Sequence, residues 1–283
     1  LDLHLSIRRQ RQMCIRDRLY HLAKEGWKDV VLIEKGELTS GSTWHAAGLI
    51  PHFIGSLNMA KIHFYGADLY KKLEEETGQA TGWHGCGAIR LALDQDQVNW
   101  FHYVKGVLDQ VGAECHLLGP DEIRKVHPLL ETDGFLMGAY TTGDGHTDPS
   151  GATQAMAVGA RNRGAEIFLN NRVTDTKLLP SGEWEVVTEK GTIVCEHLVN
   201  AAGSFCEQVG SMAGIKVPMV NMVHQYLMTE TIPEVAALEK ELPVVRDPRS
   251  SCYYRQEQSG LIIGPYEMNA KAWGLDGIDW SFD

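Results

Sequence analysis

The fold is decided by Leu19–Gly48, LYHLAKEGWKDVVLIEKGELTSGSTWHAAG. Leu19–Gly26 has a helical pattern and ends in glycine, the residue that favours the left-handed cap of a helix C-terminus. Val30–Ile33 is a run of aliphatic residues, typical of a parallel strand buried on both faces, and Glu34 follows it directly. Helix, short turn, buried strand and terminal acid match the second half of a Rossmann βαβ unit, in which the acid bonds a ribose hydroxyl. An ordinary α/β strand ending in a solvated Glu34 is the alternative.

The first half of that unit is missing upstream of Leu19. No glycine precedes Gly26, so the chain lacks the G-x-G-x-x-G turn that holds a dinucleotide pyrophosphate at a helix N-terminus. We therefore predict a Rossmann-like domain without its first strand and glycine turn.

Residues 1–17 resemble the translation of a DNA-sequencing adapter. Arg8–Asp17, RRQRQMCIRD, matches one reading frame of a common transposon-based adapter, and residues 2–4 fit the matching primer. We interpret residues 1–17 as an artefact and the chain as a metagenomic fragment that is also cut at its C-terminus. The rival interpretations are a basic nucleic-acid arm, a signal peptide or an amphipathic targeting segment. Leaving out four Arg and two Asp changes the formal charge from −11 to −13, which disfavours a nucleic-acid partner.

Composition limits the class of protein. The 283 residues, 43% of them hydrophobic, suffice for about two domains. No apolar run approaches the roughly 18 residues of a membrane span. The twelve histidines show no H-E-x-x-H spacing, and no C-x-x-C pair occurs, so we predict no metal site. Isolated cysteines also suit a reducing compartment: Cys86, Cys115, Cys195, Cys206 and Cys252.

Beyond Gly48 the pattern predicts further helices and strands. Ala88–Leu93 alternates like a strand with one wet face, and residues 172–201 predict a β-meander that returns to a strand. Asp148 and Pro149 suit the N-cap and first turn of a helix of small residues, which would pack closely against a sheet or cofactor. Two amphipathic helices have stripes expected in the core: Met59, Ile62, Gly66, Leu69, Tyr70 and Leu73 in the first, and Trp100, Val104, Val107, Leu108 and Val111 in the second.

Residues 18–283 resemble the dimethylglycine and sarcosine dehydrogenases, in the superfamily of glycine oxidase and D-amino-acid oxidase. Besides the opening stretch, the matching segments are KKLEEETG (71–78), GDGHTDP (143–149), NAAG (200–203), HQY (224–226), YYRQE (253–257) and GPYE (264–267). Within the family, GSTWHAAG and GDGHTDP favour the dimethylglycine dehydrogenases.

The resemblance implies an FAD cofactor bound covalently through His45, an imidazole nitrogen of which would join the 8α carbon of the flavin. A packed or solvated histidine is the alternative. Glu34 and Lys35 would meet the adenosine ribose, and Val173 the adenine. Small side chains and backbone N–H groups would surround the pyrophosphate and flavin along Gly41, Ser42, Thr43, Trp44, His45, Ala46, Ala47, Gly48 and Leu49. Ala202, Gly203 and Phe205 would line the last place where the chain passes the cofactor.

The resemblance also implies that His224 and Tyr253 face the flavin ring and hold the substrate. Hydride transfer from an N-methyl group requires a free amine lone pair, which a neutral His or Tyr nearby favours. A hydrogen-bonded strand histidine and a cross-strand packing ring are the respective alternatives.

We therefore predict an α/β protein. A partial Rossmann-like FAD-binding domain (18–80 and 147–215) is interleaved with a partial antiparallel-sheet α+β substrate domain (81–146 and 216–283). The implied reaction oxidises an N-methylated glycine, dimethylglycine foremost, by hydride transfer to a His-linked flavin. Sarcosine dehydrogenase and a non-catalytic regulatory paralogue of pyruvate dehydrogenase phosphatase are the alternatives.

Several expectations concern the protein's setting. Electrons would pass to an electron-transferring flavoprotein or to oxygen, and tetrahydrofolate would bind only if a further C-terminal domain exists. We expect the cytoplasm of a bacterium or the mitochondrial matrix of a eukaryote, with no membrane partner. The fragment itself is expected to be inactive, and insoluble or free of flavin.

Overall fold

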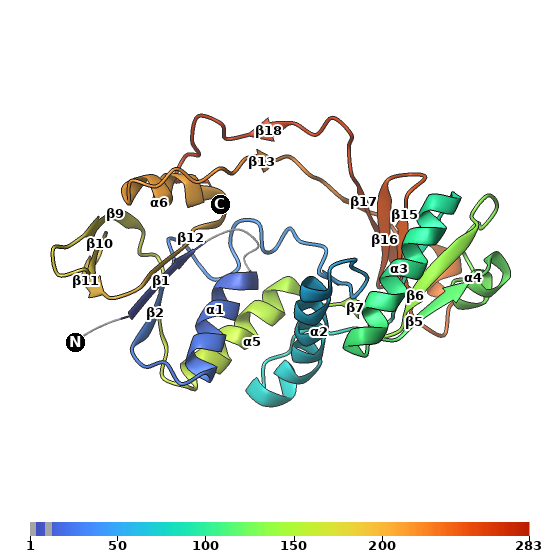
Figure 1. Cartoon of the computed structure of the whole chain (residues 1–283), viewed down its shortest axis with the longest axis horizontal. Helices are drawn as coiled ribbons and strands as arrows, with labels where there is room; N and C mark the ends of the chain where they lie inside the picture. Colours follow the sequence, from blue (N-terminus) through green and yellow to red (C-terminus); the bar gives the residue numbers. More distant parts are fainter. Residues whose placement is uncertain (1–3, 9–12, 283) are drawn as a thin grey trace.

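The computed structural model describes the backbone of residues 4–8 and 13–282 and the side chains of residues 17–282. Two groups of elements, each built around a sheet, lie at opposite ends of the molecule (Figure 1). The short strand pair β13 (Asn221–Met222) and β18 (Ala272–Trp273) lies on the long connections between them. This mixed α/β architecture is the predicted fold class.

The first sheet is parallel and has the order β12 (Leu198–Ala201), β1 (His4–Arg8), β2 (Val30–Ile33), β8 (Glu166–Phe168). All four side chains of β2 are buried. Val30 and Leu32 pack in one apolar cluster, whereas Val31 and Ile33 pack in another. Burial on both faces explains the unbroken aliphatic run and confirms the predicted parallel strand.

The strand predicted to be missing is present in this structure, so that part of the prediction is wrong. Residues 4–8 form β1, which pairs in parallel with β2 and β12. Without it, β2 and β12 would leave backbone N–H and C=O groups unpaired in the middle of the sheet, which is costly. The glycine turn is still absent from the sequence, and residues 9–12 lie outside the described residues. The adapter interpretation of residues 1–17, many of which also lie outside them, stays a prediction.

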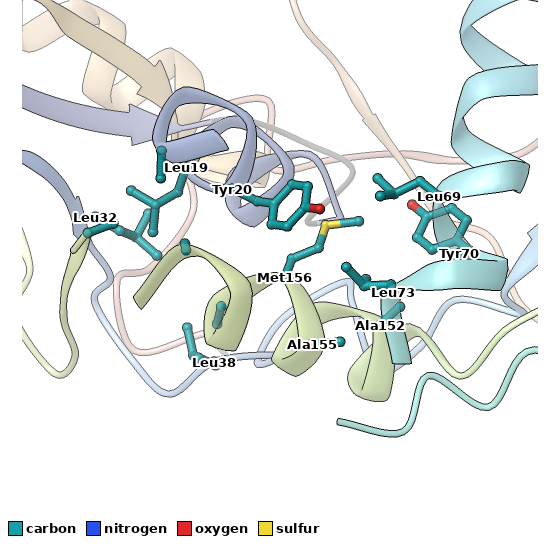
Figure 2. Packing of buried hydrophobic residues seen from close by; sticks show 14 of the residues in the cluster. Leu19, Tyr20, Leu32, Leu38, Leu69, Tyr70, Leu73, Ala152, Ala155 and Met156 are labelled. Carbon is teal, nitrogen blue, oxygen red and sulfur yellow. The ribbon is translucent and has the colours of Figure 1, made fainter. Parts of the chain in front are cut away.

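Helices α1 (Met13–Lys24), α5 (Pro149–Arg161) and α2 (Leu57–Thr77) pack together beside this sheet. Figure 2 shows Tyr20 of α1 above Met156 of α5, within a cluster that also contains Leu73 of α2. A Cβ atom on Gly159 would lie 2.8 Å from the Tyr20 ring. The small residues of α5 therefore allow close packing with α1, and they also share a buried cluster with Val30 and Leu32 of β2, as predicted for packing against a sheet.

The N-terminal end of α5 follows the sequence prediction. Asp148 caps the helix by accepting from the N–H groups of Ser150 and Gly151, and Pro149 occupies its first turn. The glycine cap predicted for the C-terminus of α1 is also confirmed, since Gly26 has a left-handed φ of 89°.

The predicted core stripes are correct only in part. Leu69, Tyr70 and Leu73 are buried, but Met59 is 42% exposed and Ile62 61% exposed. The buried residue in the first turns of α2 is instead Ala60. Trp100 is likewise 48% exposed.

The predicted meander is confirmed. β9 (Val173–Leu178), β10 (Trp184–Thr188) and β11 (Gly191–Cys195) form an antiparallel sheet on the opposite face of β2 from α1. The chain continues into β12, a turn of 3-10 helix (Gly203–Phe205) and α6 (Cys206–Met212).

The second sheet has seven strands in the order β14 (Leu227–Met228), β17 (Gly260–Pro265), β16 (Cys252–Glu257), β15 (Val244–Asp247), β4 (Ala88–Ala92), β6 (Met137–Thr141), β5 (Cys115–Leu118). The predicted antiparallel sheet is corrected at one position, because β15 and β4 pair in parallel. Helices α3 (Gln95–Val111) and α4 (Pro120–Val126) pack against it, and α7 (Pro233–Ala236) precedes β15.

Two sets of contacts connect segments that are far apart in the sequence. β3 (Leu49–Ile50) pairs with β7 (Gly145–His146) between the two sheets. The C-terminal segment returns to α6, where Ile278 and Gln208 exchange two hydrogen bonds of 2.9 Å. Among the described residues, no helix combines the length and apolar character needed to cross a membrane.

Candidate functional site

A cavity opens at the carboxyl ends of β2 and β12. This edge of a parallel sheet is where α/β proteins bind their ligands. Eight of the predicted cofactor-binding residues line the cavity together: Glu34, Lys35, Gly41, Ser42, Val173, Ala202, Gly203 and Phe205. The structure thus gathers residues from four separate segments of the sequence around one space.

The cavity has a carboxylate at the end of β2 and an aromatic wall. Oε1 of Glu34 accepts from the backbone N–H of Gly36 at 3.1 Å. Phe205 stacks on Trp280 with ring centroids 4.9 Å apart and planes 8° apart, and the Lys35 ammonium lies 5.1 Å from the Phe205 ring. The sequence interpretation missed Trp280, because an aromatic residue near the C-terminus has no pattern linking it to β2.

These residues fit the adenosine half of a dinucleotide. Glu34 offers an acceptor for ribose hydroxyls, and Gly41 and Gly203, with φ of 71° and 59°, leave the backbone open to close approach. The pyrophosphate fits less well, because no glycine lies between β1 and α1. The cavity therefore provides part of a dinucleotide site.

His45 lies outside that cavity lining, as do Thr43, Trp44, Ala46, Ala47 and Gly48. Its side chain is exposed, its ring lies tilted by 34° against that of Trp44 with centroids 3.6 Å apart, and its Nδ1 is 3.0 Å from the carbonyl oxygen of Gly41. A carbonyl can only accept, so Nδ1 carries the hydrogen. In the neutral ring the lone pair is then on Nε2, which is the atom available to react.

Gly48 connects this loop to the GDGHTDP segment. Its φ is 71°, and a Cβ atom there would lie 2.0 Å from the backbone oxygen of Thr147. The Thr147 N–H also donates to the Gly48 carbonyl at 3.0 Å. Only glycine fits here, which fixes where β3 and Leu49 begin.

Replacing Gly48 with alanine is expected to lower the free energy of unfolding by about 3 kcal/mol, from a left-handed backbone and a steric clash. Gly182→Ala is the matched control, because Gly182 has φ of 91° and open space around it; it should cost about 1 kcal/mol. Urea unfolding followed by circular dichroism measures both. Equal losses for the two variants would contradict the close approach to Thr147.

Leu49 lines a second, narrow cavity, whose lining also includes residues of β4, β6 and β15. Three charged side chains face it: Arg90, Arg246 and Asp144. Burial lowers the pKa of Arg90, and the positive charge of Arg246 lowers it further. Two guanidinium groups therefore share one small, largely apolar space.

His224 and Tyr253, the predicted substrate-binding pair, lie close together. Their ring centroids are 6.5 Å apart, and the His224 ring stacks on Tyr266 at 4.8 Å. Tyr253 is only 4% exposed, and burial raises the pKa of its phenol. His224 is more open, with Nδ1 4.0 Å from a carboxylate oxygen of Glu267.

Arg246 links this pair to the second cavity. It lies opposite Tyr253 in the β15–β16 ladder and opposite Arg90 in the β15–β4 ladder. Its guanidinium donates to the Tyr266 hydroxyl at 2.7 Å. The sequence interpretation missed both arginines. The available signal was a charge within an apolar strand at Arg90, and a charge directly after two valines at Arg246.

One group within residues 17–282 has the composition of a metal site, namely His84, His146 and Glu241. Both histidines contact the carboxylate, at 2.8 and 2.5 Å. The Arg255 guanidinium lies 3.2 Å from Nδ1 of His146, so Nδ1 accepts and Nε2 donates to Glu241. Hydrogen bonds account for this group without an ion, and the expected lack of a metal stays a prediction.

Comparison with known proteins places the chain in a family. The model of the family described as FAD dependent oxidoreductase (DAO) matches residues 19–282. The chain belongs to this family. The sequence is 46% identical over 268 residues to the mitochondrial dimethylglycine dehydrogenase of Rattus norvegicus, covering 93% of this chain and 31% of that protein.

Two further relatives of this FAD-dependent oxidoreductase are more distant. Mitochondrial sarcosine dehydrogenase of Mus musculus is 35% identical over 277 residues, covering 93% of this chain and 30% of that protein. The mitochondrial pyruvate dehydrogenase phosphatase regulatory subunit of Mus musculus is 31% identical over 254 residues, covering 89% and 29%. The chain thus spans about a third of the length of these relatives.

The fold agrees with that of a solved family member. The crystal structure of L-proline dehydrogenase from P. horikoshii superposes with a TM-score of 0.82 at 26% identity, covering 93% of this chain and 69% of that one. The FAD-binding fold predicted from the sequence is confirmed.

Proposed function

We propose that this FAD-dependent oxidoreductase oxidises an N-methylated glycine, dimethylglycine foremost, with its flavin bound to His45. The observation that carries the proposal is the higher identity to dimethylglycine dehydrogenase than to sarcosine dehydrogenase over the same share of the chain. The cavity at β2 supports it, because it is built for the adenosine end of the cofactor.

FAD supplies the acceptor for the hydride in such a reaction. Glu34 and Lys35 bind the adenosine, while Gly41, Ser42, Ala202 and Gly203 leave room for the cofactor's backbone. Nε2 of His45 anchors the flavin, since Nδ1 is committed to the Gly41 carbonyl.

His224 and Tyr253 orient the substrate beside the seven-stranded sheet. The raised pKa of Tyr253 keeps its phenol protonated at neutral pH, so the hydroxyl can donate a hydrogen bond. His224 lies at the more open side of this pair and favours the neutral form of the amine, whose lone pair must be free when the hydride leaves.

The setting of the reaction also belongs to this proposal. Electrons pass to an electron-transferring flavoprotein or to oxygen, and tetrahydrofolate takes part only where a folate-binding domain is joined to this region. The enzyme works in the mitochondrial matrix or the bacterial cytoplasm. The 18–80 and 147–215 segments form the FAD-binding domain, and 81–146 with 216–283 the substrate domain.

Anaerobic mixing of each amine with FAD-loaded protein that carries glycine at residues 10, 12 and 15 tests the proposal. Dimethylglycine is expected to bleach the flavin with an efficiency at least about tenfold above that of sarcosine, the discrimination that one methyl group provides. Trimethylamine, which lacks the carboxylate, is the control amine and should leave the flavin oxidised. Faster bleaching by sarcosine would assign a sarcosine dehydrogenase, and no bleaching by either amine would favour the regulatory paralogue.

A further inference from the structure

A segment from the far end of the chain lies against the cavity at β2. We call residues 278–282 the strap. Its first residue, Ile278, exchanges two hydrogen bonds of 2.9 Å with the side chain of Gln208 in α6. Two side chains beyond this attachment, Trp280 and Phe282, line the cavity. The strap is therefore fixed beside the site proposed for the adenosine half of the cofactor.

The strap contacts the groups that this site offers to adenosine. Nζ of Lys35 donates to the backbone carbonyl oxygen of Phe282 at 2.8 Å. The Trp280 indole stacks on Phe205 with planes 8° apart, and the guanidinium carbon of Arg172 lies 5.2 Å from the centre of the indole. Lys35 and Phe205 were both predicted to bind the cofactor, and each has a partner from the strap.

The Trp280 side chain is held in the way that proteins hold a nucleobase. A base stacks on an aromatic ring or on the plane of an arginine, and Phe205 and Arg172 offer these two groups to the indole. Indole is also a planar bicyclic ring close in size to adenine. The centroids of Trp280 and Phe205 are 4.9 Å apart, whereas a base between two rings needs about 7 Å. Adenine can therefore stack on this side of Phe205 only where the indole lies.

We propose that the strap is an internal competitor of the cofactor, with the Trp280 indole in the place of the adenine and the Phe282 carbonyl in the place of a ribose oxygen. The inference rests on the adenosine site of the proposed function and adds its regulation. The apparent affinity for a nucleotide falls with the fraction of chains in which the strap covers the site. Loosening the strap should therefore raise that affinity, whereas loss of an ordinary wall of the site would lower it.

Equilibrium dialysis of the whole chain with AMP, and with ribose 5-phosphate, which lacks the base, tests the competition. Trp280→Ala is expected to tighten the binding of AMP by about tenfold, the effect of one stacked ring. The gain for ribose 5-phosphate should be smaller, because it does not use the place of the indole. Gln208→Met removes both hydrogen bonds to Ile278 and leaves the cavity lining unchanged, so it should also tighten AMP, by about fivefold.

Two further variants complete the test. Arg172→Gln in the Trp280→Ala chain should reverse much of the gain for AMP, since the guanidinium then stacks on the base. Trp100→Ala, which truncates an exposed indole of α3, should change the binding of neither ligand. Because the expected changes are gains in affinity, a variant that unfolds cannot imitate them.

Three results would overturn the proposal. An unchanged or weaker affinity for AMP in Trp280→Ala would make Trp280 an ordinary wall of the site. Equal gains for AMP and ribose 5-phosphate would contradict the place assigned to adenine. A wild-type chain and variants that all fail to bind AMP would show that the strap covers no nucleotide site.

These outcomes are separate from those of the amine experiment. Tighter binding of AMP by Trp280→Ala, without bleaching of the flavin by either amine, supports the strap and refutes the proposed reaction. Bleaching by dimethylglycine without a gain for AMP refutes the strap and leaves the proposed reaction in place.

Discussion

The chain is expected to purify without tightly bound flavin, and a variant with Gln10→Gly, Gln12→Gly and Ile15→Gly is expected to retain FAD. The three changes create G-x-G-x-x-G from the residues that follow β1 into the first turn of α1, where a Rossmann unit holds the pyrophosphate. The adenosine cavity is already formed, but the sequence lacks the glycines that let phosphates approach backbone N–H groups closely. Two regained charge-assisted hydrogen bonds should tighten FAD by about a hundredfold or more.

Desalting after incubation with FAD, followed by visible absorbance, measures the retained flavin. The matched control places alanine at residues 10, 12 and 15. It removes the same side chains but leaves a Cβ at each position, so it should stay colourless. A yellow wild-type chain, or equal retention by the alanine and glycine variants, would show that the pyrophosphate does not need this turn.

Sequence patterns predicted the elements whose burial is periodic. β2 was predictable because both of its faces are buried, and α5 because Asp148 and Pro149 mark its start. The exposure of Met59 and Ile62 was not predictable, since an apolar stripe gives the face of a helix but not how far its partner extends. β1 was missed because residues 4–8 carry no pattern that separates them from the adapter-like segment.

The site was predictable where its residues lie close together in the sequence. Glu34 ends a buried strand, and the glycine-rich stretch that contains Gly41 follows it closely in the sequence. This side of the β2 cavity could therefore be anticipated. Arg90, Arg246 and Asp144 are far apart in the chain and meet only through the order of the strands. The parallel pairing of β15 with β4 places the two arginines opposite each other, and nothing in either strand alone predicts that register.

His45→Ala, made in the chain with glycine at residues 10, 12 and 15, is expected to abolish flavin that stays attached to the protein after acid precipitation. The reason is that Nδ1 of His45 donates its hydrogen to the Gly41 carbonyl, so the lone pair of Nε2 is the nucleophile. Noncovalent FAD should still bind, because the adenosine cavity does not include His45. Flavin fluorescence of the precipitated protein and mass spectrometry of its peptides measure the linkage.

His63→Ala is the matched control for that experiment. Nδ1 of His63 also bonds a backbone carbonyl, that of Pro51, at 2.7 Å, so it offers the same kind of nitrogen in the same tautomer. Attachment in His63→Ala and its loss in His45→Ala would show that position, rather than intrinsic imidazole reactivity, selects the anchor. Acid-stable flavin in His45→Ala would contradict the assignment and direct the search to another nucleophile. Acid-labile flavin in both variants and in their parent would mean that this chain holds FAD without a covalent bond, so that binding would depend on the β2 cavity and the glycine turn alone.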